Sequence, residues 1–164
     1  MSTPSVKSEN CIARGDLRIA VRCVKTGTVI RRLQIKNTIT ADGLTALVNV
    51  FRQTDPMVDY RFKEIRVGTG ITLPLRSDFD LAAPLIPPVN IALTQESTQT
   101  SQTADPFEIR VLATLGADQA NGSMLTEAAI GMMNDKIFSR QTHAGIAKND
   151  ALVFDYDWRI TITA

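Results

Sequence analysis

The clearest hydrophobic pattern in the chain lies in residues 152–162, where apolar and polar side chains alternate. Phe154, Tyr156 and Trp158 fall on one face, with Ile160 and Ile162, while aspartate, arginine and threonine occupy the other. Because successive side chains of a strand point to opposite faces, this alternation predicts a half-buried antiparallel strand. Two further strands are predicted just before it, at residues 125–131 and 136–143.

A second alternating pair lies near the N-terminus, where residues 16–24 and 28–36 predict a β-hairpin around Gly27. Arg31 falls on the apolar face of the return strand, so we expect a bulge or a partly exposed edge there. Residues 1–14 are polar and show no periodicity, and we interpret them as a flexible arm.

A helical pattern occurs once, over about residues 40–53. Its apolar residues recur at the spacing of an amphipathic helix: Leu44, Leu47, Val48 and Phe51. Thr40 is a good N-cap residue, and the pattern stops before the Asp-Pro pair at 55–56. We expect this helix to close one end or cover one edge of the β-structure.

The middle of the chain is less regular. Strands are predicted at 62–67 and 107–115, with a weaker one at 91–96. Residues 71–90 contain four prolines and predict a long connection, which in compact domains tends to be a functional or interacting segment. Residues 97–103 are entirely polar and predict a loop tip.

About eight strands and one helix, without an internal repeat, predict a mainly β protein. We expect an antiparallel β-sandwich, jelly-roll-like, with residues 15–164 forming one domain behind the arm of residues 1–14. The 164 residues contain 44% hydrophobic and 21% charged side chains, as is typical of globular proteins. No apolar run is long enough to span a membrane, and the N-terminus lacks the apolar stretch of a secretory signal.

The net charge of +1 hides an asymmetry, because residues 1–36 carry +6 and residues 37–134 carry −5. The basic N-terminal hairpin is therefore a candidate interface with an acidic partner or with residues 150–157 of another copy. Nucleic acid is not a favoured partner, since the basic residues lack interleaved aromatics and any reading motif. The candidate interface residues in this region are Arg14, Arg18, Arg22, Arg31 and Arg32.

No catalytic, cofactor or metal site is expected. His143 is the sole histidine and has no nucleophile motif or second metal ligand beside it. Asp150, Asp155 and Asp157 do not match a calcium loop and are interpreted as solvent-facing strand carboxylates that pair with arginines. The sequence of residues 68–70 lacks the remaining elements of a phosphate loop. Two cysteines, Cys11 and Cys23, do not make a disulfide scaffold, and a bridge between them is disfavoured.

Glu127 lies among apolar and small residues of a predicted strand. A buried carboxylate needs an opposite charge or backbone amides, because an unpaired buried charge is costly. We therefore predict a structural ion pair between Glu127 and Arg140.

The order of short motifs resembles that of small virion proteins of tailed bacteriophages over about residues 30 to 163. The matching segments are Asn37-Thr38-Ile39-Thr40 with Gly43, Val67-Gly68-Thr69-Gly70, Leu125-Thr126-Glu127-Ala128, Phe138-Ser139-Arg140 and the closing Trp158 strand. The chain departs from the family pattern at Ala129, where a glycine is usual. The resemblance implies a structural, non-enzymatic protein at the tail, neck or collar, baseplate or fibre-attachment region.

An assembly component of this kind is expected in the virion, after synthesis in the host bacterial cytoplasm. Its partners would be other copies of itself and other virion proteins, with no small-molecule substrate or cofactor. A second contact surface is expected in the apolar segment near residue 85: Leu81, Pro84, Leu85, Ile86 and Pro87. The alternatives are a capsid decoration protein and, in another class, a carbohydrate-binding β-sandwich module, against which the low aromatic content (5%) argues.

Overall fold

A computed structural model describes residues 12–52, 58–93, 99–101 and 107–163. Nine strands and one helix follow one another in this part of the chain: β1 (Ile12–Cys23), β2 (Val29–Ile39), α1 (Ala41–Arg52), β3 (Phe62–Gly68), β4 (Pro84–Ala92), β5 (Gln99–Ser101), β6 (Phe107–Leu115), β7 (Met124–Met132), β8 (Ile137–Ala147) and β9 (Leu152–Thr163). The mainly β composition and the single helix at about residues 40–53 are confirmed within the described ranges. Of the predicted tip at 97–103, residues 99–101 form the short strand β5 instead of a loop, and the rest lies outside these ranges.

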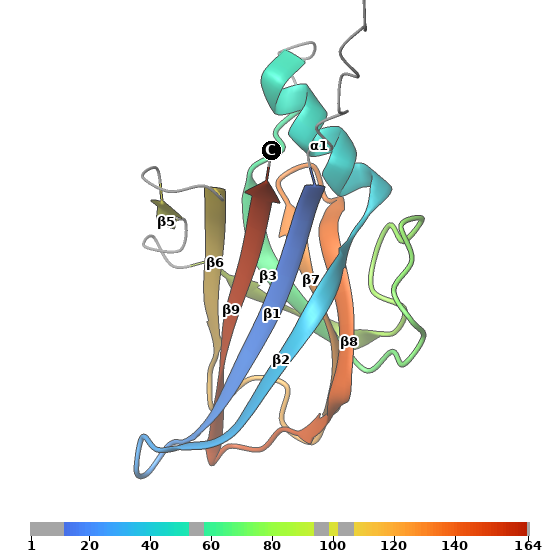
Figure 1. Cartoon of the computed structure of the whole chain (residues 1–164). Helices are drawn as coiled ribbons and strands as arrows, with labels where there is room; N and C mark the ends of the chain where they lie inside the picture. The colour runs from blue at the N-terminus through green and yellow to red at the C-terminus, as the bar shows by residue number, and fades with distance from the viewer. Residues whose placement is uncertain (1–11, 53–57, 94–98, 102–106, 164) are drawn as a thin grey trace, which may run out of the picture.

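The strands form one antiparallel sheet in the order β4-β3-β7-β8-β2-β1-β9-β6-β5. This sheet is curled, so that β3 and β7 lie behind β1 and β9 (Figure 1). Among the described residues, its two halves (β4-β3-β7-β8 and β2-β1-β9-β6-β5) are joined by strand pairing at the end of β2, where Thr38 and Ile39 pair with Arg140 and Ser139 of β8. The predicted separation into the two sheets of a jelly-roll sandwich is not confirmed, because β2 takes part in both halves.

The first and last strands are neighbours at the centre of the sheet. β1 pairs with β9 along its whole length, from Ile12 opposite Thr163 to Cys23 opposite Leu152. The domain therefore begins at least three residues before the predicted boundary, and residues 12–14 belong to a strand instead of an arm. The rest of the predicted arm, residues 1–11, lies outside the described residues. The expected irregularity at Arg31 is present, because the β1–β2 register shifts there and the Arg31 side chain is exposed.

The core fills the inside of the curled sheet. The face of β9 that carries Phe154, Tyr156, Trp158 and Ile160 is fully buried, as its alternation predicts. Inward side chains of the other strands pack against this face in a single hydrophobic cluster. The packing leaves the polar face of β9 on the outside of the sheet.

Helix α1 lies across one end of the curled sheet (Figure 1) and packs against β8. Thr40 caps it as predicted, because its hydroxyl accepts a hydrogen bond from the Gly43 amide at 3.0 Å. The same hydroxyl donates to the carbonyl of Ile137 at 2.6 Å, which ties the helix to β8. Leu44 and Leu47 pack against the core, whereas Val48 is half exposed.

The prediction of a structureless connection over residues 71–90 is wrong in its second half. Pro84–Ala92 forms β4, an edge strand that pairs only with β3. Proline has no N–H to donate, so it is tolerated in a strand at the edge of a sheet. A shorter loop, residues 69–83, remains between β3 and β4.

Candidate functional site: an anchored apolar loop

A buried ion pair between neighbouring strands organises the 69–83 loop. Glu127 of β7 is fully buried and Arg140 of β8 is 1% exposed. Nε and Nη2 of Arg140 both lie 2.8 Å from Oε2 of Glu127. The residues predicted as a structural pair are thus in direct contact.

The carboxylate of Glu127 also holds both ends of the loop. Its Oε1 accepts hydrogen bonds from the backbone amides of Gly70 at 2.9 Å and Ala83 at 2.8 Å. Its Oε2 accepts a third, from Ala82 at 3.0 Å. Three amides and one guanidinium therefore compensate a charge that would otherwise be strongly unfavourable at this depth.

Arg140 extends the same network into the loop. Its Nη1 lies 2.8 Å from Oδ2 of Asp78, and its Nη2 donates to the carbonyl of Thr72 at 3.1 Å. The loop is fixed from outside as well, because the Ala41 amide donates to the Arg76 carbonyl at 2.7 Å. Strands β7 and β8 and the start of helix α1 therefore all form hydrogen bonds with the loop.

Glycine is required where the loop leaves β3. A Cβ atom on Gly68 would come within 2.7 Å of Oε1 of Glu127, and one on Gly70 within 2.4 Å. Both distances are well inside van der Waals contact, so a side chain would displace the carboxylate from its amides. The glycines of the Val-Gly-Thr-Gly motif are explained by this close approach.

Two further segments of the sequence form hydrogen bonds beside this ion pair. Asn37 donates its amide to the hydroxyl of Ser139, and that hydroxyl donates to the carbonyl of Thr38 at 2.8 Å. Thr126 donates to the carbonyl of Gly70 at 2.9 Å. Segments far apart in the sequence thus form one structural unit around the ion pair.

The loop and the adjoining edge strand expose large apolar side chains. Their exposed fractions run from 60% to 96% for five residues: Ile71, Leu73, Leu75, Phe79 and Ile86. We call these five residues the apolar loop surface; the loop lies to the right of β8 in Figure 1. Apolar side chains gathered in this way on an anchored loop are typical of a protein contact site.

The interface residues predicted in this region differ in how far they are exposed to solvent. Leu81 is only 8% exposed and packs with Ala129 and Ile137, so it is a core residue of this chain. Leu85 is partly buried against the main core. Pro84, Ile86 and Pro87 are exposed on β4, and Ile86 is itself part of the apolar loop surface.

The predicted basic residues lie on and beside the outer face of β1 and β2. Arg14 and Arg32 are exposed, Arg18 is half-buried, and Arg31 donates to the Gly145 carbonyl at 3.1 Å. Arg22 forms two hydrogen bonds with Asp155 of the same chain, one of them at 2.8 Å. The Arg22 hydrogen bond holds the pKa of Asp155 below its usual value.

Asp157 and His143, the other candidate residues of the sequence, contact groups of the same chain. Asp157 is paired with Arg110 at 2.8 Å and with Arg159 at 3.1 Å. No group of three possible metal ligands occurs among the described residues. Burial lowers the pKa of His143, and its Nδ1 lies 3.0 Å from the Ala144 carbonyl.

Two groups of the anchor were not anticipated from the sequence: Asp78 and Thr72. They contact Arg140 from 62 and 68 residues away, and no spacing signal links them to it. Lys148 is also buried and donates to two carbonyls and to the side chain of Asn121. Burial lowers the pKa of Lys148.

Among the described residues, no helix has the length and apolar character that a membrane crossing needs. No family model, no curated protein and no solved structure matches this chain.

Proposed function

We propose that this protein is a structural, non-enzymatic component of a tailed-bacteriophage virion that assembles in multiple copies. Its place would be the tail, neck or collar, baseplate or fibre-attachment region. The observation that carries the proposal is the apolar loop surface, whose side chains are exposed although its backbone is fixed by the Glu127–Arg140 pair. A contact loop held in place before binding loses little conformational entropy on association.

The phage resemblance and the contact surface concern the same residues. Gly70, Glu127 and Arg140 belong to the motifs that carry the resemblance, and they are also the groups that position the loop. The jelly-roll-like sandwich stays part of this proposal. It is supported by the narrow junction between the two halves of the sheet, which is limited to two residue pairs.

Two alternatives use the same surfaces differently. A capsid decoration protein would also need an apolar contact site, so the apolar loop surface suits it equally well. A carbohydrate-binding module needs exposed aromatic rings, but Tyr156 and Trp158 are buried in the core, and the exposed ring of Phe79 lies among the aliphatic side chains of the apolar loop surface. The module therefore has less support than the assembly component.

The test is the native mass of the purified chain and of two surface variants. We expect a multimeric wild type, and a monomer for the variant Leu73→Ser/Phe79→Ser with an unchanged unfolding transition. Val24→Ser serves as a matched control, because Val24 is half exposed on the β1–β2 turn, away from the loop. A monomeric wild type that binds glycans on an array would reject the proposal in favour of the module.

A further inference from the structure

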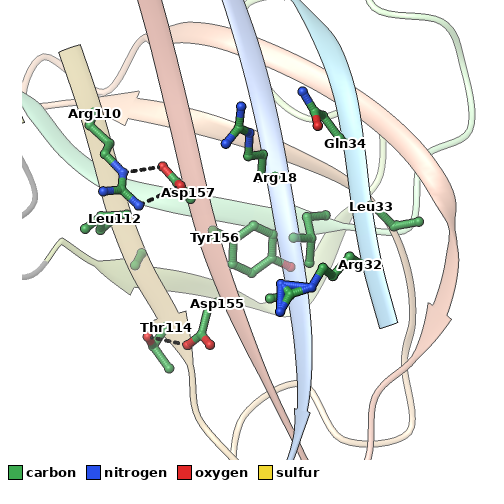
Figure 2. A pocket seen from close by; sticks show the side chains of 13 residues that line it. Arg18, Arg32, Leu33, Gln34, Arg110, Leu112, Thr114, Asp155, Tyr156 and Asp157 are labelled. Carbon is green, nitrogen blue, oxygen red and sulfur yellow. Dashed lines mark hydrogen bonds and ion pairs between the residues drawn. The ribbon is translucent and has the colours of Figure 1, made fainter. Parts of the chain in front are cut away.

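A hollow of about 680 Å³ lies on the outer face of β2, β1, β9 and β6, away from the apolar loop surface (Figure 2). Its size falls within the range of small-molecule sites, which is also room for a few residues of a peptide. Arginines and aspartates line it together, over a floor that includes the small side chain of Ala20 and the apolar side chain of Leu112. This surface is independent of the contacts in the proposed function.

The two aspartates in the hollow are already paired. Asp157 accepts two hydrogen bonds of 2.8 Å from Arg110, drawn as dashed lines in Figure 2. Asp155 is bound by Arg22 and accepts a hydrogen bond from the Thr114 hydroxyl at 3.0 Å. The β9 and β6 side of the hollow therefore has little uncompensated charge.

Two arginines on the β1 and β2 side differ from this pattern. Neither Arg18 nor Arg32 forms an ion pair with any residue in the described ranges. Nε of Arg18 is buried and has no hydrogen-bond partner there. A buried donor without an acceptor is uncommon, so the surroundings of Arg18 are suited to an external anion.

The spacing of these two arginines indicates what kind of anion fits. In the β1–β2 register, Arg18 lies opposite Gln34 and Ala20 lies opposite Arg32, so the two arginines are diagonal neighbours. Diagonal positions in an antiparallel pair are about 7–8 Å apart. Side chains at i and i+2 of an extended peptide point the same way and are about 6.5–7 Å apart.

We propose that this hollow binds an extended acidic segment of a partner protein, whose carboxylates at positions i and i+2 pair with Arg18 and Arg32. The backbone N–H groups of such a segment also supply donors for the remaining lone pairs of Asp155 and Asp157. A nucleic acid fits less well, because its backbone presents mainly acceptors to these aspartates. The ring of Tyr156, the aromatic residue at this hollow, is buried and offers no face for a base.

The experiment is an NMR titration of the ¹⁵N-labelled full chain with the blocked peptide Ser-Glu-Ser-Glu-Ser. We expect saturable shifts of the Ala20 and Leu112 amides, and none with the neutral peptide Ser-Gln-Ser-Gln-Ser. Arg18→Gln and Arg32→Gln should each raise Kd by roughly tenfold or more, through loss of a charge-assisted pair. Arg76→Gln is the matched control, since Arg76 is exposed on the distant loop, and should change Kd by less than about twofold.

Separate titrations with inorganic phosphate and with a thymidine oligonucleotide distinguish the other anions. Tighter binding of the oligonucleotide than of the acidic peptide would overturn the proposal. So would an absence of shifts with the acidic peptide, or binding that Arg32→Gln leaves unchanged. Arg32 is exposed and has no ion pair within the described ranges, so this variant is expected to fold even if Arg18→Gln does not.

Discussion

Replacing Arg140 by methionine tests whether the buried ion pair anchors the 69–83 loop. Methionine keeps the unbranched stem but removes the contacts with Glu127, Asp78 and Thr72. Breaking one side of a buried pair costs about 3–5 kcal/mol, because the other charge stays buried without its partner. Glu127 would keep its three backbone amides, so we expect a loss near the lower end, about 3 kcal/mol.

Urea unfolding at neutral pH measures this loss. With a slope of about 2 kcal/mol/M, the midpoint should fall by roughly 1.5 M. Hydrogen exchange should also become faster at the amides of Gly70, Ala82 and Ala83, which donate to Glu127. The matched control is Arg61→Met, because Arg61 forms an exposed pair with Asp59 and should lose at most about 1 kcal/mol.

A double variant sharpens the test. In Glu127→Gln/Arg140→Met the second substitution acts on a pair that is already broken, so the total loss should be less than the sum of the single losses. A loss of less than about 1 kcal/mol for Arg140→Met would show that the pair does not anchor the loop. Single losses that add, or unchanged exchange at the loop amides, would show the same.

Three further outcomes follow from the structure. Gly70→Ala should destabilise the fold by roughly 2–3 kcal/mol in urea unfolding, because its Cβ would meet Glu127; a loss below about 0.5 kcal/mol would contradict this. Tyr156→Phe should leave the thermal midpoint unchanged or raise it, because the buried hydroxyl has no hydrogen-bond partner among the described residues. Burial raises the pKa of Asp157, but hydrogen bonds from two arginines outweigh it and hold this pKa below its usual value. A hydrogen bond from one arginine lowers the pKa of Asp155 in the same way. Their stabilisation is therefore complete above about pH 5 and is lost as the pH falls through the lowered pKa values, so Asp155→Asn and Asp157→Asn should make the thermal midpoint less sensitive to acid.

Local patterns were sufficient to predict most elements of this fold. The alternation in β9 identified its buried face, and the helical spacing with Thr40 gave helix α1 to within about a residue at each end. The partner of Glu127 could also be inferred, because a carboxylate in an apolar strand needs a cation and Arg140 lies on the next strand. All three predictions concern residues that are close in the sequence, where the spacing of apolar side chains determines which face of an element is buried.

The features that were missed depend on pairing between distant segments. Strand β4 was hidden by its prolines, which obscure a strand pattern but are tolerated at an edge. The continuity of the sheet depends on two residue pairs at the end of β2, which no periodicity reveals. The exposure of the apolar loop side chains and the burial of Leu81 against Ala129 and Ile137 depend on how the loop is seated on β7 and β8, far from it in the sequence.

The central pairing of β1 with β9 has a consequence for synthesis on the ribosome. β1 and β9 lie at opposite ends of the described chain, so the middle of the sheet cannot close until residues 152–163 have been made. At about 5–20 residues per second, the roughly 140 residues after β1 take about 7–28 s to translate. Until β8 has been made, β1 and β2 can pair only with each other, and their apolar faces stay exposed until the strands that cover them are present. We therefore expect this sheet to close only after β9 has been made and to fold slowly, as in other chains dominated by non-local strand pairing.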